Sequence, residues 1–65
     1  MTRQAAILEF IRSFIAQHGY APTLREIAAG VGVGLSGNVH RYVHHLRDIG
    51  KITFDDHKPR TIRIK

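Results

Sequence analysis

Residues 22–43 read PTLREIAAGVGVGLSGNVHRYV, and this stretch decides the fold. Its first part predicts a short helix, because Pro22 disfavours a helical conformation at the residue before it. Thr23 and Glu26 lie three positions apart and form the pattern of a capping box, which starts a helix. We expect this helix over about residues 24–30. Its buried side chains should be Ile27, Ala28 and Val31.

The glycine-rich part of the stretch has two interpretations. Gly32, Gly34 and Gly37 form a Gly-x-Gly-x-x-Gly pattern, which cradles a phosphate in dinucleotide-binding folds. Those folds require a strand before the glycines, whereas a capped helix precedes them here. The pattern therefore favours a turn, in which Gly30, Gly32 and Gly34 allow the chain to reverse at positive φ.

Another helix begins near Ser36, a residue type that commonly caps helix N-termini. Its apolar residues recur at helical spacing and should face the core, and Gly50 should end it. These core-facing residues are Val39, Tyr42, Val43 and Leu46. Two short helices joined by a glycine-containing turn are typical of a helix-turn-helix.

The opposite face of this helix carries side chains that can recognise DNA bases. Arginine pairs with guanine, asparagine with adenine, histidine donates or accepts a hydrogen bond, and an apolar side chain contacts the thymine methyl group. In a helix-turn-helix, the start of the second helix enters the major groove. The expected base-reading residues are Leu35, Ser36, Gly37, Asn38, His40, Arg41 and His44. An ordinary solvated helix face is the alternative.

The flanking segments complete the domain. Apolar residues recur at helical spacing from Ile7 onward, which predicts an amphipathic helix that ends at Gly19. Apolar residues alternate with polar ones in residues 51–54 and 62–65, which predicts a β-hairpin. The expected fold is mainly α with a small β-hairpin: a three-helix winged helix-turn-helix over residues 1–65. Its expected core is Ile7, Phe10, Ile11, Phe14, Ile27, Val39, Val43, Leu46, Ile52 and Ile62.

The charge of the chain favours a polyanionic partner. Ten Lys and Arg side chains against five Asp and Glu give a net charge of +5. Such an excess on a small domain is expected of a protein that binds nucleic acid, whose phosphates attract it regardless of sequence. The expected contacts to the DNA backbone are Thr23, Arg25, His45, His57, Lys58 and Arg60.

Other classes of function lack support in the sequence. His40 and His44 lie one helical turn apart, a spacing that can hold zinc, but the chain has no cysteine and only His57 could join them. We therefore expect no metal site and no cofactor. No Ser-His-Asp set or catalytic carboxylate pair indicates an enzyme. No apolar run approaches the roughly 18 residues of a membrane span, so we expect a cytoplasmic, nucleoid-associated protein.

The sequence resembles the N-terminal winged helix-turn-helix domain of the LexA family of SOS-response repressors. The resemblance lies in TRQAAILEFIRSFIAQHGYAPTLREIA (residues 2–28), SGNVHRYVHHLRDIGKI (36–52) and KPRTIRI (58–64). It implies operator binding through the third helix, repression of transcription, and two domains on a palindromic site. By position, it maps the base-reading region to residues 35–41.

The chain departs from the family in two ways that shape these expectations. Residues 34–38 read GLSGN and place Gly34 and Gly37 near the start of this helix, where family members usually have two serines or Ser-Pro, so we expect different preferred bases. The family's second domain, which dimerises the repressor and cleaves its own linker, has no counterpart in these residues. The apolar side chains of this small domain are needed for its own core and leave no second apolar face for a large interface, so we expect a monomer in free solution and two copies on DNA. The competing hypothesis is a winged-helix interaction module that modulates a host or phage transcription regulator.

Overall fold

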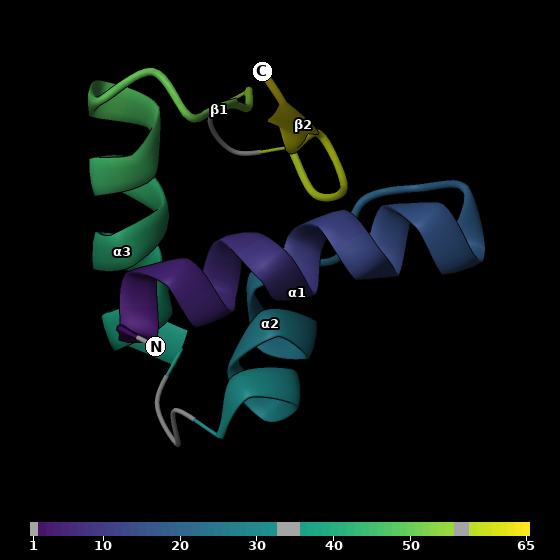
Figure 1. Cartoon of the computed structure of the whole chain (residues 1–65), viewed down its shortest axis with the longest axis horizontal. Coiled ribbons are helices and arrows are strands. Elements are labelled where there is room, and N and C mark those ends of the chain that lie inside the picture. Colours follow the sequence, from purple (N-terminus) through teal and green to yellow (C-terminus); the bar gives the residue numbers. More distant parts are fainter. Residues whose placement is uncertain (1, 33–35, 56–57) are drawn as a thin grey trace.

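Within the residues that the computed structural model describes, 2–32, 36–55 and 58–65, three helices precede an antiparallel pair of short strands (Figure 1). The side chains of residues 36–38 lie outside this description. The elements are α1 (Arg3–His18), α2 (Leu24–Val31), α3 (Ser36–Asp48), β1 (Ile52–Thr53) and β2 (Arg63–Ile64). This order confirms the predicted winged helix-turn-helix fold.

Residues just outside α1 define both of its ends. Thr2 caps the N-terminus, where its side-chain oxygen accepts a hydrogen bond from the Ala5 amide at 3.1 Å. At the other end Gly19 adopts the left-handed conformation with φ of 80°, and its amide donates to the Ile15 carbonyl at 2.8 Å. A side chain would be strained at this φ, so glycine ends the helix here, as predicted.

Helix α2 begins with the predicted capping box. The Thr23 amide donates to Glu26 Oε1 at 2.8 Å, and the Glu26 amide donates to Thr23 Oγ1 at 3.1 Å. The helix continues to Val31, one residue beyond the predicted end, and Gly32 closes it with φ of 75°. Val31 is half-buried and not buried as predicted, because it lies in the last turn of the helix.

Gly30 has a different role from the predicted one. It lies inside α2 and does not have positive φ; Gly34 lies outside the described residues. A Cβ atom at position 30 would stand 2.0 Å from Cε2 of Phe10, on α1. Glycine at this position therefore leaves room for the Phe10 ring where α1 packs on α2, and does not form a turn.

The effect of Gly30→Ala on the stability of the domain should accordingly depend on Phe10. Alanine favours the helix by up to about 1 kcal/mol, but overpacking against the ring should cost about 1–3 kcal/mol, so we expect a net loss of stability. In a Phe10→Ala background the clash is absent, and the same substitution should stabilise the domain. Urea unfolding of the wild type, the two single variants and the double variant measures this coupling. An equal effect of Gly30→Ala in both backgrounds would contradict it.

The hairpin is shorter than the alternation predicted. Ile52 pairs with Ile64 and Thr53 with Arg63, in antiparallel register. Beyond this ladder the hydroxyl of Thr61 accepts a hydrogen bond from the Asp55 amide at 2.9 Å. It also lies 3.1 Å from the Lys58 carbonyl and 3.3 Å from that of Asp55, to one of which it donates. This side chain holds the two arms together where the strand pairing has ended.

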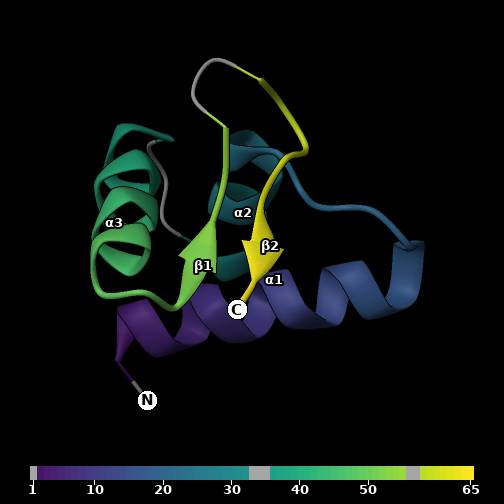
Figure 2. The same ribbon diagram turned by 90° about the horizontal axis from the view of Figure 1, so that it is seen from above.

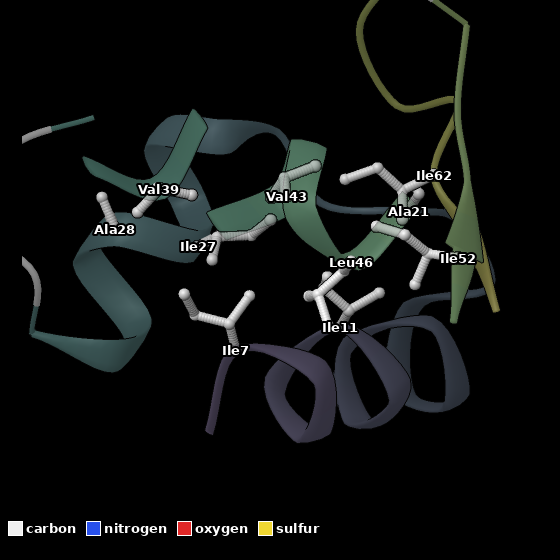
Figure 3. Close-up of a cluster of buried hydrophobic side chains, with 10 residues drawn as sticks. All are labelled: Ile7, Ile11, Ala21, Ile27, Ala28, Val39, Val43, Leu46, Ile52 and Ile62. Carbon is white, nitrogen blue, oxygen red and sulfur yellow. The ribbon is translucent and has the colours of Figure 1, made fainter. Parts of the chain in front are cut away.

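One cluster of aliphatic side chains joins all the elements (Figure 3). Helix α1 packs against both α2 and α3, and α3 contacts β1 (Figures 1 and 2). The buried side chains are Ile7, Ile11, Ala21, Ile27, Ala28, Val39, Val43, Leu46, Ile52 and Ile62. The prediction was wrong for Phe10 and Phe14, which are half-buried. Phe14 instead contacts His18 and Tyr20 near the end of α1, with ring centroids 4.2 and 5.7 Å apart, and the Tyr20 contact is edge-on.

None of the described helices is both long and apolar enough to cross a membrane.

Candidate nucleic-acid interface

Helix α3 separates an apolar side from a basic one. Val39 and Val43 are fully buried against the rest of the domain. His40, Arg41 and His45 lie on exposed parts of the same helix. A guanidinium and imidazoles are therefore available to a partner, as the helical projection of the sequence predicted.

The start of the predicted base-reading segment is only partly described. Leu35 lies outside the described residues. Ser36, Gly37 and Asn38 form the first turn of α3, and their side chains lie outside the description. The roles of these four residues stay predictions.

His44 is less accessible than the sequence suggested. It is half-buried, and its ring stands edge-on to that of Phe54 from the hairpin, with centroids 5.1 Å apart. Its two nitrogens have partners: Nε2 lies 3.0 Å from His40 Nε2, and Nδ1 lies 3.1 Å from Arg47 Nη2. The Arg47 guanidinium also covers the Phe54 ring at 4.4 Å. A projection of α3 alone could not reveal this contact, because Phe54 belongs to another element.

Two of the predicted backbone contacts, Thr23 and Arg25, lie at the N-terminal end of α2. Arg25 is exposed, whereas Thr23 is half-buried. The capping box already uses the amides of Thr23 and Glu26. A phosphate that approached this helix end would therefore have to use the other amides of the turn together with Arg25.

Arg60 joins the hairpin to α2, a role that the sequence analysis missed. Its Nη1 donates to Glu26 Oε1 at 2.9 Å and to the Ala21 carbonyl at 3.1 Å, and Nη2 donates to Glu26 Oε2 at 3.3 Å. The guanidinium also lies 4.8 Å from the centre of the Tyr20 ring. Arg60 has φ of 59°, which is uncommon for a residue with a side chain. These contacts orient the base of the hairpin loop against the start of α2.

Glu26 serves both the cap of α2 and this bridge. The hydrogen bond from the Thr23 amide, and then the bond from Arg60, lower the pKa of Glu26 below its ordinary value of 4.5, while desolvation acts in the other direction. A carboxylate whose pKa is lowered by folding stabilises the folded state above the unfolded pKa. That contribution is lost as the pH falls through the folded pKa.

Glu26→Gln should therefore reduce the acid sensitivity of the domain. Glutamine still accepts the Thr23 amide but binds no proton, so the loss of stability between about pH 5 and pH 2 should be smaller than in the wild type. Urea unfolding over this range tests the expectation. Glu9→Gln, which removes an exposed carboxylate from α1, should leave the acid response close to that of the wild type. A Glu26→Gln response equal to the wild-type one would contradict the assignment.

A hollow of about 540 Å³ lies between the start of α2, α3 and the hairpin loop. His40 and His44 line it from α3, and Lys58 and Arg60 line it from the loop. Lys58 is exposed, and His57 lies outside the described residues. The tertiary structure thus brings predicted base-reading and backbone-binding residues to one concave surface, although they are separated in the sequence.

Comparisons with known proteins agree on one family. The family model described as the LexA DNA-binding domain matches residues 1–61. The chain is 45% identical over 62 residues to a LexA repressor of Pelotomaculum thermopropionicum and 44% identical over 62 residues to one of Clostridium novyi. Both alignments cover 95% of this chain and 30% of the relative. The chain thus spans about a third of the length of these relatives.

Proposed function

This chain belongs to the LexA DNA-binding domain family, and from this premise we propose that it binds a specific sequence of double-stranded DNA through α3 and represses transcription. The observation that carries the proposal is the exposed basic face of α3, with His40 and Arg41, beside the hairpin residue Lys58. A helix of this kind fits the major groove, and a basic hairpin fits the adjoining phosphates.

Base recognition is assigned to the first turns of α3. Arg41 suits guanine, Asn38 suits adenine, and Leu35 suits a thymine methyl group. His40 offers an exposed ring, whereas His44 would have to exchange an existing partner for a base. Ser36 and Gly37 would allow close approach at the start of the helix.

Contacts to the DNA backbone are assigned to the first turn of α2, to His45 and to the hairpin loop. Arg25 and Lys58 are exposed and suit phosphate directly. Thr23 and Arg60 act mainly by holding the helix start and the loop in place, since both are engaged with Glu26. His57 is assigned from the sequence alone.

Lys58→Ala should weaken binding to every duplex to a similar extent. Loss of one phosphate contact should flatten the dependence of log affinity on log salt by about 0.9 of a unit. Titrations of a specific and a scrambled duplex at several salt concentrations measure both quantities. A change in sequence preference with an unaltered salt slope would show that Lys58 reads bases or groove shape.

The proposed assembly is a monomer in free solution and two copies on a palindromic operator. The apolar residues of the helices are largely committed to the shared core, and among the described residues the large exposed hydrophobic side chains are Tyr20 (49%) and Ile49 (46%). Two-fold related half-sites would present a major groove to each α3. Sedimentation of the free protein, followed by titration onto whole and half operators, distinguishes one bound copy from two.

Selection from random duplex DNA tests the function as a whole. An enriched palindrome is the expected result, and it would assign this chain an operator. The absence of enrichment would favour the interaction module in place of a DNA reader. Binding to an operator in the chromosome would also agree with the expected location of the protein at the nucleoid.

A further inference from the structure

His40 and His44 form a close pair on α3. Their Nε2 atoms lie 3.0 Å apart, whereas their ring centroids are 4.2 Å apart. The rings therefore converge at their Nε2 ends, one helical turn apart on the same side of the helix. The proposed DNA contacts do not require this convergence, since each ring could face a base separately.

The partners of His44 determine where its proton lies. A guanidinium only donates hydrogen bonds, so Arg47 Nη2 donates to His44 Nδ1. The neutral His44 ring then carries its proton on Nε2 and directs it toward Nε2 of His40. The Nε2 atom of His40 is accordingly a lone-pair acceptor that faces its neighbour.

The sequence led us to expect no metal site, but the close approach of the two Nε2 atoms changes this expectation. We propose that His40 and His44 together chelate a divalent transition-metal ion, with Cu²⁺ bound most tightly. Two imidazole nitrogens 3.0 Å apart, each about 2.0–2.1 Å from a shared ion, subtend an angle of roughly 95° at it. That angle matches neighbouring positions of a tetragonal Cu²⁺ or Ni²⁺ site better than a tetrahedral zinc site. Imidazole is a preferred ligand of both ions, and Cu²⁺ stands highest in the affinity order.

The site is an exchangeable chelate and not a structural centre. Among the described residues no group of three or more His, Cys, Asp or Glu side chains could hold a metal, so this part of the chain supplies the ion with two ligands. Lys58 lines the same hollow, and its positive charge lowers the affinity for a cation. Binding also requires the His44 proton to move from Nε2 to Nδ1, which displaces Arg47 from that nitrogen.

A bound ion would stand on the face that α3 is proposed to present to DNA. It would occupy both imidazoles at a point where His40 would otherwise meet a base edge. We therefore expect metal binding and specific DNA binding to compete; this part rests on the proposed function, whereas the metal site itself does not.

Titration of the whole domain with Cu²⁺ in the absence of DNA tests the site directly. Visible absorption and electron paramagnetic resonance should report nitrogen coordination at one ion per chain. His40→Ala should lower the affinity by at least about tenfold, because a single imidazole loses the chelate advantage. His45→Ala is the matched control, since His45 is also exposed on α3, and its affinity should equal that of the wild type. Equal Cu²⁺ affinity in the wild type and His40→Ala would overturn the proposal.

Thermal unfolding gives a second readout that does not depend on spectroscopy. An ion that binds only the folded pair should raise the Tm of the wild type and of His45→Ala but not that of His40→Ala. Circular dichroism confirms that each variant is folded before metal is added. The same rise in all three proteins would place the ion elsewhere on the chain and reject the pair.

A competition experiment with DNA separates the metal-site proposal from the proposed DNA-binding function. With the selected operator, Cu²⁺ should weaken binding by the wild type several-fold more than binding by His40→Ala. Competition that is equal in both proteins would reject the coupling. If no operator is found, the spectroscopic titration still tests the metal site. If the titration shows no Cu²⁺ binding, an enriched operator still supports the DNA-binding function.

Discussion

Replacing Ile27 with alanine should lower the free energy of unfolding by about 2–5 kcal/mol. Ile27 is fully buried in α2, and in Figure 3 it lies between the side chains of α3 and Ile7 of α1. The removed methylene and methyl groups would leave a cavity that three packed helices cannot readily fill. A domain of this size has a total stability of only about 3–10 kcal/mol, so a large share of it rests on this one side chain.

Urea unfolding followed by circular dichroism measures this loss. Ile49→Ala provides the matched control, because it removes the same atoms from a side chain that is 46% exposed. Its effect should stay within about 0.5–1 kcal/mol. Equal losses in the two variants would show that α2 is not packed against the core as described.

Replacing Arg41 with alanine should have the largest effect on recognition. If its guanidinium pairs with a guanine, the loss on the preferred site should be about 1–3 kcal/mol, or roughly 5- to 150-fold in affinity. The loss on a scrambled duplex should be much smaller, because only one charge among many is removed. Since Arg41 is exposed, the fold should not change.

Affinities on the selected operator and on its scrambled form test this expectation. Arg12→Ala, which removes an exposed guanidinium from α1, is the matched control and should preserve the ratio of the two affinities. If Arg41→Ala lost the same affinity on both duplexes, Arg41 would be a phosphate contact and not a base-reading residue. The base-reading role would then have to lie in another part of α3.

The helices and their ends could be predicted because their signals are local. The capping box of Thr23 and Glu26 and the end of α1 at Gly19 depend on residues that are close in the sequence. The periodic apolar residues identified most of the core for the same reason, since a helix places residues three and four apart on one face. The failures at Phe10 and Phe14 lie at the edge of that stripe, where exposure depends on what packs beside it.

Only those features of the candidate interface that a helical projection of α3 shows could be predicted from the sequence. The exposure of His40 and Arg41 was predictable from the positions of Val39 and Val43. The half-buried state of His44 was not, because it depends on Phe54 in the hairpin. The prediction that Arg60 contacts phosphate likewise rested on its place in a basic loop. The sequence did not indicate that Arg60 pairs with Glu26.

The sequence by itself determined the elements of this protein, their order, their apolar faces and the basic character of α3. The tertiary structure alone decided which distant residues meet: Gly30 with Phe10, and Arg60 with Glu26. These contacts have no sequence signal because they arise from the angles at which whole elements pack. Those angles are set by the combined shape of many buried side chains, and no local spacing encodes them.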